Sequence, residues 1–238
     1  MERNRENCFI IKFKIMSNKV IFQENELNKL KEILEKEKQD WKTIVWTNGC
    51  FDIMHPGHMK TFETARSIWW KNTIVIVWLN WEDSPYWKTK PWRPINDEEF
   101  RSKILASLKN VDYIYIFNDK TPARPVEELK PNYVLKWGDY YIKKISEELI
   151  WWLSEDKKEK IKKFNSIVEK LVINENWILD ITWIYEYILE NDLIDFTKNI
   201  KWFMKEGLVN VKNGWKVVLV PVEWNYSTSS IVEKIKNL

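Results

Sequence analysis

Residues 43–58 read TIVWTNGCFDIMHPGH and contain two adjoining local signals. The first five residues are mostly apolar and β-branched, which is typical of a buried strand. Pro56 suits the first turn of a helix, and residues 57–67 continue with a helical pattern. The stretch therefore predicts a strand, a turn at Gly49 and a helix that begins just after Pro56.

The same alternation of strand and helix continues along the chain. Helical patterns are found at 25–38, 97–109, 125–129 and 229–236, and β-branched runs at 74–77, 111–117, 133–136 and 216–222. Alternating elements of this kind favour a parallel sheet with helices on both faces and ligands at the carboxyl ends of the strands. The sequence thus predicts an α/β fold with a Rossmann-like, doubly wound parallel sheet.

Two segments depart from this rhythm. Residues 151–213 are mostly helical in pattern and rich in Lys, Glu and Ile, which predicts a helical insertion in the main domain. Residues 1–15 lack periodicity, and we expect them to form a disordered extension. Residues 16–238 are then expected to form one domain that contains the insertion.

Composition excludes several classes of protein. The chain has 238 residues, of which 45% are hydrophobic and 31% charged, a balance that excludes disorder throughout. The net charge of +3 gives no sign of nucleic-acid binding. Two cysteines make no disulfide framework, which favours a reducing, cytoplasmic location. The longest apolar run, 73–81, is too short for a membrane helix, so we expect no membrane partner.

His55 and His58 are the only histidines, and they flank the predicted start of a helix. Backbone N–H groups at such a position attract phosphate, and Gly57 lets a ligand approach the main chain. A purely structural pair and a metal-binding pair are the alternatives. No Cys, His or Glu cluster completes a zinc set, so no metal site is predicted. The pattern favours a phosphate site.

Four segments in order carry a resemblance to a known family: TNGCFDIMHPGH at 47–58, RPI at 93–95, KWGDY at 136–140 and YSTS at 226–229. Together they resemble the motifs of the cytidylyltransferase-like nucleotidyltransferases. They are most similar to the heptose-1-phosphate adenylyltransferase domain of ADP-heptose synthesis. The resemblance covers roughly 41–150 and 214–237, and residues 16–238 would form the nucleotidyltransferase domain.

The resemblance implies transfer of AMP from ATP to a sugar phosphate such as heptose 1-phosphate, with release of pyrophosphate and with Mg²⁺ carried by the triphosphate. It implies three catalytic residues, namely His55, His58 and Lys60. The implied nucleotide-binding residues are Thr47, Asn48, Gly49, Phe51, Gly57, Asn80, Arg93, Lys136, Gly138, Asp139, Ser227 and Thr228.

Several alternatives stay open at this stage. Lys60 fits an ordinary exposed helix lysine equally well, and Ser227 and Thr228 fit a helix cap. CTP could replace ATP, as in a glycerol-3-phosphate cytidylyltransferase-like enzyme, and the chain could be a non-catalytic nucleotide-binding module. A homodimer is also left open.

The ratio of glycine to tryptophan is abnormal. The chain has 5 Gly and 16 Trp, whereas an average chain of this length has roughly 17 Gly. Tryptophan stands where the family motifs have glycine at Trp92, Trp137 and Trp224, and at Trp78 in the strand end before Asn80. Other tryptophans lie in turn-like contexts, namely Trp41, Trp81 and Trp215.

Our hypothesis is that the source organism reads the UGA codon as glycine and that the printed chain shows these codons as tryptophan. We expect glycine at 78, 92, 137 and 224 to be needed for nucleotide binding, because an indole there would fill the phosphate site. The contexts of Trp46 and Trp87 do not require glycine. The alternative is a genuinely tryptophan-rich protein with an occluded site.

Overall fold

The computed structural model describes seven segments of the chain, and all structural statements below refer to them. They are residues 20–81, 93–118, 121–137, 153–169, 179–197, 205–220 and 228–236. The expected disordered extension, 1–15, lies outside these segments and stays a prediction.

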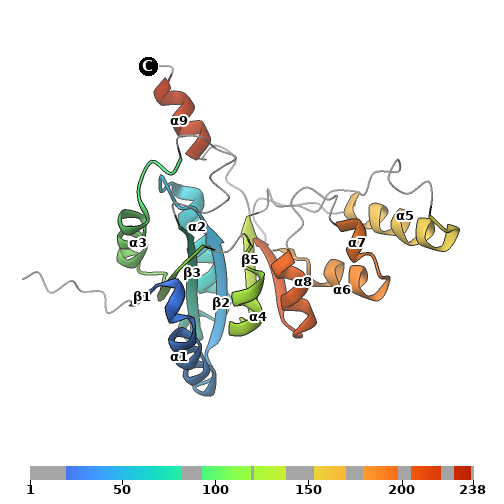
Figure 1. Ribbon diagram of the computed structural model, residues 1–238, viewed down its shortest axis with the longest axis horizontal. Coiled ribbons are helices and arrows are strands. Elements are labelled where there is room, and N and C mark those ends of the chain that lie inside the picture. The colour runs from blue at the N-terminus through green and yellow to red at the C-terminus, as the bar shows by residue number, and fades with distance from the viewer. Residues whose placement is uncertain are drawn as a thin grey trace, which may run out of the picture.

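A seven-stranded sheet forms the centre of the fold (Figure 1). Its spatial order is β1-β4-β3-β2-β5-β7-β6, and every neighbouring pair is parallel except β6 with β7. The strands are β1 (Val20–Phe22), β2 (Thr43–Gly49), β3 (Thr73–Asn80), β4 (Tyr113–Phe117), β5 (Tyr133–Trp137), β6 (Leu179–Asp180) and β7 (Lys216–Val220). The predicted α/β fold with a parallel sheet is confirmed.

The order of the strands identifies where a ligand is expected. The chain first builds outward from β2 through β3 to β4, and then returns to the other side of β2 to add β5 and β7. In a doubly wound sheet this reversal opens a crevice at the carboxyl ends of the two central strands. Here those strands are β2 and β5, and residues 47–58 run out of β2 at that edge.

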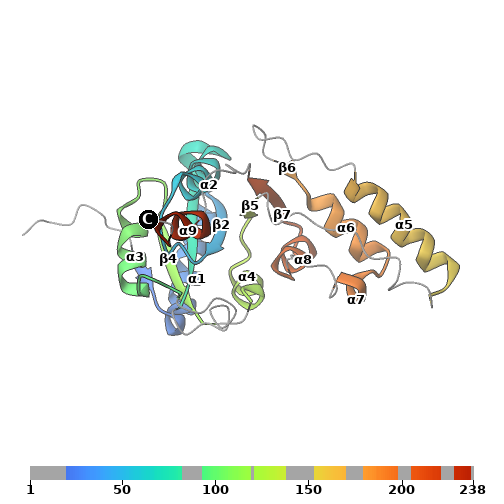
Figure 2. The same cartoon turned by 90° about the horizontal axis from the view of Figure 1, so that it is seen from above.

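Helices cover both faces of the sheet, as predicted. One face packs against α1 (Leu27–Gln39) and α4 (Ala123–Leu129), in a core that contains Leu30, Trp46 and Val126. The opposite face packs against α2 (Pro56–Ser67) and α3 (Glu98–Ser107), with Phe62 and Leu105 in the core. Helix α9 (Thr228–Lys236) lies above the carboxyl edge of the sheet (Figures 1 and 2).

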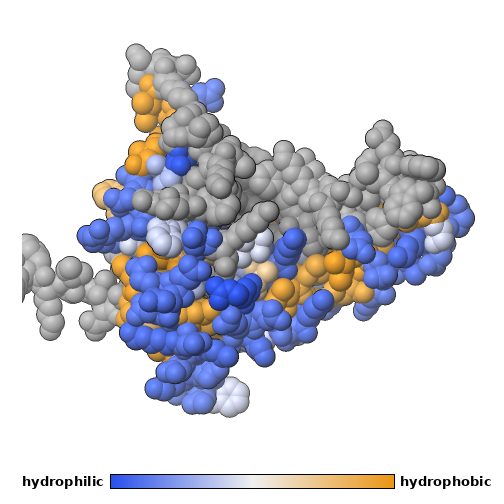
Figure 3. Space-filling model, viewed as in Figure 1, coloured by the Kyte–Doolittle hydropathy of each residue, from blue (hydrophilic) through white to orange (hydrophobic). Residues whose placement is uncertain are grey.

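The predicted insertion, 151–213, contains four described helices. These are α5 (Glu155–Glu169), α6 (Thr182–Glu190), α7 (Ile194–Thr197) and α8 (Lys205–Lys212). They extend the molecule beyond the β7 side of the sheet (Figure 2). Helices α5, α6 and α8 share a core cluster with β7, and hydrophobic surface is visible along α6 and α8 (Figure 3). None of the helices in the described segments is long and apolar enough to cross a membrane.

Three features differ from the sequence-based expectation. The short strands β1 and β6 were not predicted, because runs of three and two residues show no periodicity. The side chain of Trp78, expected beside the phosphate site at a strand end, lies in the hydrophobic core instead. Trp78 is a fully buried residue of β3 whose ring contacts Trp46, Tyr115 and Phe117.

Candidate functional site

The two histidines lie where the loop after β2 enters helix α2. His55 is the residue before the helix and has an extended backbone, and Pro56 begins the helix. The side chains of His55 and His58 are buried, with 7% and 8% of their surface exposed, and their ring centroids are 3.8 Å apart. Both imidazoles thus lie at the helix N-terminus, where the backbone N–H groups carry partial positive charge.

A hydrogen bond fixes which nitrogen of His58 carries its proton. The backbone N–H of His55 donates to Nδ1 of His58 across 3.3 Å. A neutral imidazole has one acceptor nitrogen and one donor nitrogen, so Nε2 of His58 carries the proton. His58 therefore carries its N–H on Nε2.

The imidazoles are uncharged at neutral pH. Burial, followed by the neighbouring His55, lowers the pKa of His58 to about 3. Burial also lowers the pKa of His55. The site therefore combines neutral imidazoles with the positive end of a helix, an environment without imidazolium charge that suits a phosphate group.

This shift predicts a loss of stability in mild acid. His58 titrates near pH 6.5 in the unfolded chain and near 3 in the folded one, so the unfolded state binds more protons below pH 6.5. We expect the free energy of unfolding to fall by about 2 kcal/mol between pH 7 and pH 5 through this group. Urea titrations at the two pH values measure it. The same fall in His58→Asn would contradict the assignment to His58.

The loop between β2 and α2 is held in a strained conformation. Phe51 has φ 44°, in the left-handed region, and its ring contacts His58 and Phe62. A Cβ at Gly49 would lie 3.1 Å from that ring. Gly49 therefore leaves room for the Phe51 ring, which packs against His58. Nucleotide binding by Gly49 and Phe51 stays a prediction.

Asp52 and Arg101 are two residues of this site that sequence reasoning missed. The carboxylate of Asp52 accepts from the backbone N–H groups of Ile95 and Asn96 at 2.9–3.1 Å. Its nearest arginine is Arg93, whose Nε lies 4.0 Å away. Asp52 thus fixes the end of the RPI motif and the residue after it against the histidine loop.

Arg101 is fully buried on α3 and donates to the carbonyls of Cys50, at 2.7 Å, and Asn80, at 2.9 Å. It thereby joins the end of β3 to the histidine loop. A sequence signal for it exists, because Arg101 falls on the same helical face as Leu105 and Leu108, where an arginine is unusual.

The structure brings most of the predicted residues to one edge of the sheet. Thr47 is buried in β2, Asn48 and Gly49 end that strand, Asn80 ends β3 and Lys136 lies near the end of β5. Thr228 at the start of α9 donates to the carbonyl of Ile53 across 3.4 Å, so α9 begins beside the histidine loop. Gly138, Asp139 and Ser227 lie outside the described residues.

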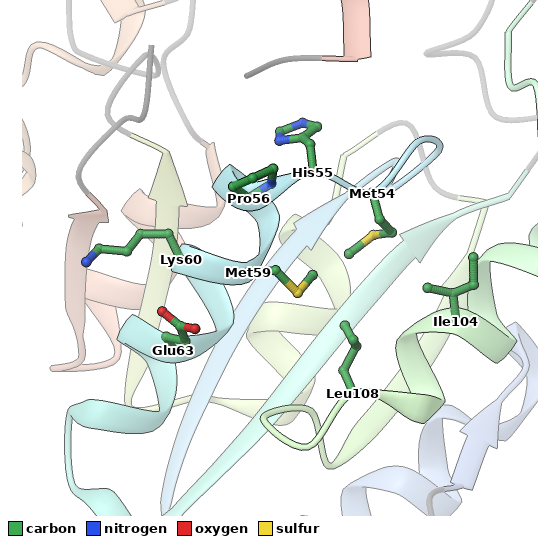
Figure 4. A pocket seen from close by; sticks show the side chains of 8 residues that line it. All are labelled: Met54, His55, Pro56, Met59, Lys60, Glu63, Ile104 and Leu108. Atoms are coloured by element: carbon green, nitrogen blue, oxygen red, sulfur yellow. The ribbon is translucent and has the colours of Figure 1, made fainter. Parts of the chain in front are cut away.

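Lys60 lines a cavity of about 550 Å³ beside His55 (Figure 4). Lys60 and Glu63 extend to one side of α2, whereas Met54, Met59 and Leu108 gather on the other (Figure 4). The described segments contain no group of three or more His, Cys, Asp and Glu side chains that could hold a metal ion.

Comparison with known proteins places these features in a family. The family model described as cytidylyltransferase-like matches residues 46–234. The protein called "Bifunctional protein HldE" is 42% identical over 114 residues in Geobacter metallireducens and 46% identical over 99 residues in Aliarcobacter butzleri. These matches cover 48% and 42% of this chain, and 23% and 20% of the relatives. The chain therefore spans about a quarter or less of the length of these relatives.

A crystal structure, that of the lipopolysaccharide core biosynthesis protein from Thermoplasma volcanium, is 24% identical and has a TM-score of 0.36. The alignment covers 51% of this chain and 87% of that one. The family match spans both the histidine loop and the start of α9, and it confirms the resemblance found in the four motifs. The chain belongs to the cytidylyltransferase-like family.

Proposed function

We propose that the protein is an adenylyltransferase that transfers AMP from ATP to a sugar phosphate such as heptose 1-phosphate. The observation that carries this proposal is the pair of neutral imidazoles at the N-terminus of α2, at the edge of the sheet where β2 and β5 end and a doubly wound fold is expected to bind its ligand. Membership of the cytidylyltransferase-like family supports the class of reaction, and the RPI and KWGDY motifs support the heptose branch.

The chemistry requires positioning more than proton transfer. A phosphate oxygen of the sugar phosphate is already anionic, so it can attack the α-phosphorus of ATP without a general base. The new P–O bond forms as the bond from the α-phosphorus to the β-bridging oxygen breaks, and pyrophosphate leaves with the electron pair. Catalysis then depends on holding the two phosphates in line and on stabilising the added charge.

The described residues supply suitable groups for that task. His58 carries a proton on Nε2, and the first backbone N–H groups of α2 lie at the positive end of the helix dipole. Thr228, which begins α9, is joined to the same loop by its hydrogen bond to the carbonyl of Ile53, so a second helix start lies there. Mg²⁺ is proposed to arrive with the triphosphate. A cytoplasmic location and a homodimer also stay proposals.

A pyrophosphate-release screen of the protein with glycine at 92, 137 and 224 tests the proposal. ATP and CTP are each combined with heptose 1-phosphate and with glycerol 3-phosphate, and each triphosphate alone serves as the control. We expect release from ATP with heptose 1-phosphate to exceed the other combinations at least tenfold. Release only from CTP with glycerol 3-phosphate would replace this proposal with the cytidylyltransferase. Binding of a triphosphate without release in any combination would indicate a non-catalytic module.

A further inference from the structure

A buried ion pair joins helix α8 to the end of strand β5. The ammonium of Lys136 lies 2.7 Å from Oε1 of Glu206, and the two residues are only 5% and 6% exposed. Lys136 also donates to Oδ1 of Asn48 and lies 5.1 Å from the centroid of the Trp46 ring. The contacts link one strand on each side of the central crevice with a helix of the predicted insertion.

The surroundings of Lys136 define its role. Its ammonium has three donors, and a carboxylate and an amide oxygen already accept from it inside the protein. Removing two charges from water costs free energy even when they are well paired. Two hydrophobic side chains would fill the same space without that desolvation cost. A lysine held in this manner is better suited to fixing a neighbour than to reaching out to a phosphate.

The neighbour that it fixes is the side-chain amide of Asn48. Lysine can only donate, so Asn48 must turn its oxygen toward Lys136, and its NH₂ group then points away from the ion pair. Asn48 is half-buried and occupies the second-last position of β2, immediately before Gly49 and the histidine loop. Its NH₂ group is therefore a fixed donor at the carboxyl edge where the nucleotide is expected.

We propose that Glu206 and Lys136 are positioning residues that orient the Asn48 amide as a donor to the bound nucleoside triphosphate. This proposal rests on the proposed function and extends it in one respect. Helix α8, which the sequence assigned to an insertion, becomes part of the machinery of the site. Lys136, which the family resemblance implied as a direct nucleotide ligand, acts through Asn48.

A mutant cycle tests the coupling. The double variant Lys136→Met/Glu206→Leu removes both charges at once, a replacement that buried pairs often tolerate without loss of stability. We expect it to weaken ATP binding about tenfold or more, the scale of one oriented hydrogen bond to a charged group. In an Asn48→Ala background the same double change should have little further effect. Calorimetric ATP binding and thermal unfolding provide the readouts.

The outcomes separate positioning from a structural role. An equal loss of affinity in both backgrounds would overturn the proposal, because the pair would then not act through Asn48. A ligand-free readout uses the side-chain NH₂ signals of Asn48 by NMR, which should be rigid in the parent and mobile in the double variant. Unchanged rigidity would also overturn the proposal. All variants are made in a parent with glycine at 92, 137 and 224. If that parent binds neither ATP nor CTP, the proposed function fails and the nucleotide half of this inference fails with it, whereas the NMR result still decides the positioning.

Discussion

Replacement of His58 by alanine is expected to lower the rate of pyrophosphate release about 10²-fold or more, and the same holds for His55→Ala. The physical reason is that a preorganised N–H donor stabilises the charge added in the transition state, and water in the vacated space must be reorganised to do so. The effect should fall on kcat more than on the apparent affinity for ATP. Steady-state kinetics with the best pair of substrates from the screen measure both quantities.

A stability measurement and a control variant separate lost catalysis from lost folding in this experiment. His58→Ala also removes ring contacts with Phe51, so its thermal unfolding must be measured to separate misfolding from lost chemistry. Lys103→Ala is the matched control, because this exposed lysine on α3 pairs only with Glu99 among the described residues. Near-parental turnover in both histidine variants would remove the histidines from the mechanism.

The central strands could be predicted because their sequence pattern follows directly from their burial. Every residue of β3 is buried, so residues 74–79 are apolar without interruption, as expected for a strand covered on both faces. The edge strands could not be predicted. Val20–Phe22 and Leu179–Asp180 are too short to show a period, and they become strands only through pairing with β4 and β7.

The residues of the candidate site also fall into two groups, those that the sequence predicts and those that it does not. His55, His58 and Gly49 lie within one contiguous motif, so the sequence alone places them together. Three other residues act through partners that are far away in the sequence, namely Asp52, Arg101 and Glu206. The sequence around each of them does not indicate which residues those partners are. A long-range contact of this kind becomes visible only when the sheet order is known, because the order decides which loops meet at one edge.

The geometry at Trp41 bears on the proposal that some tryptophans are recoded glycines. Helix α1 ends with the N–H of Lys42 donating to Glu37 and that of Trp41 donating to Lys38, both at 3.0 Å. These two bonds define a Schellman motif in which residue 41 occupies the left-handed position. Trp41 has φ 59° and is 88% exposed, so its indole gains almost no burial to offset the backbone strain.

Trp46 and Trp78 present the opposite situation. Both are fully buried on neighbouring strands, with ring centroids 4.8 Å apart. Neither Nε1–H has an acceptor among the described residues, which costs about 1–3 kcal/mol for each group. The space is nevertheless filled by aromatic atoms of the core, so the expectation that the Trp78 indole fills the phosphate site is wrong. Trp92 and Trp224 lie outside the described residues, so the expectation of glycine at these two positions stays a prediction.

Trp41→Gly is therefore expected to raise the free energy of unfolding by about 1 kcal/mol, because glycine adopts φ > 0 without steric cost. Trp46→Gly, the matched control, should lower it by about 3–5 kcal/mol, because it empties a large site in the core. Denaturant titrations of the two variants and the parent give the comparison. The recoding proposal further expects TGA at codon 41 of the gene and a glycine-containing peptide in the protein from its source organism. A less stable Trp41→Gly protein, or TGG at codon 41, would show that the indole belongs at the end of α1.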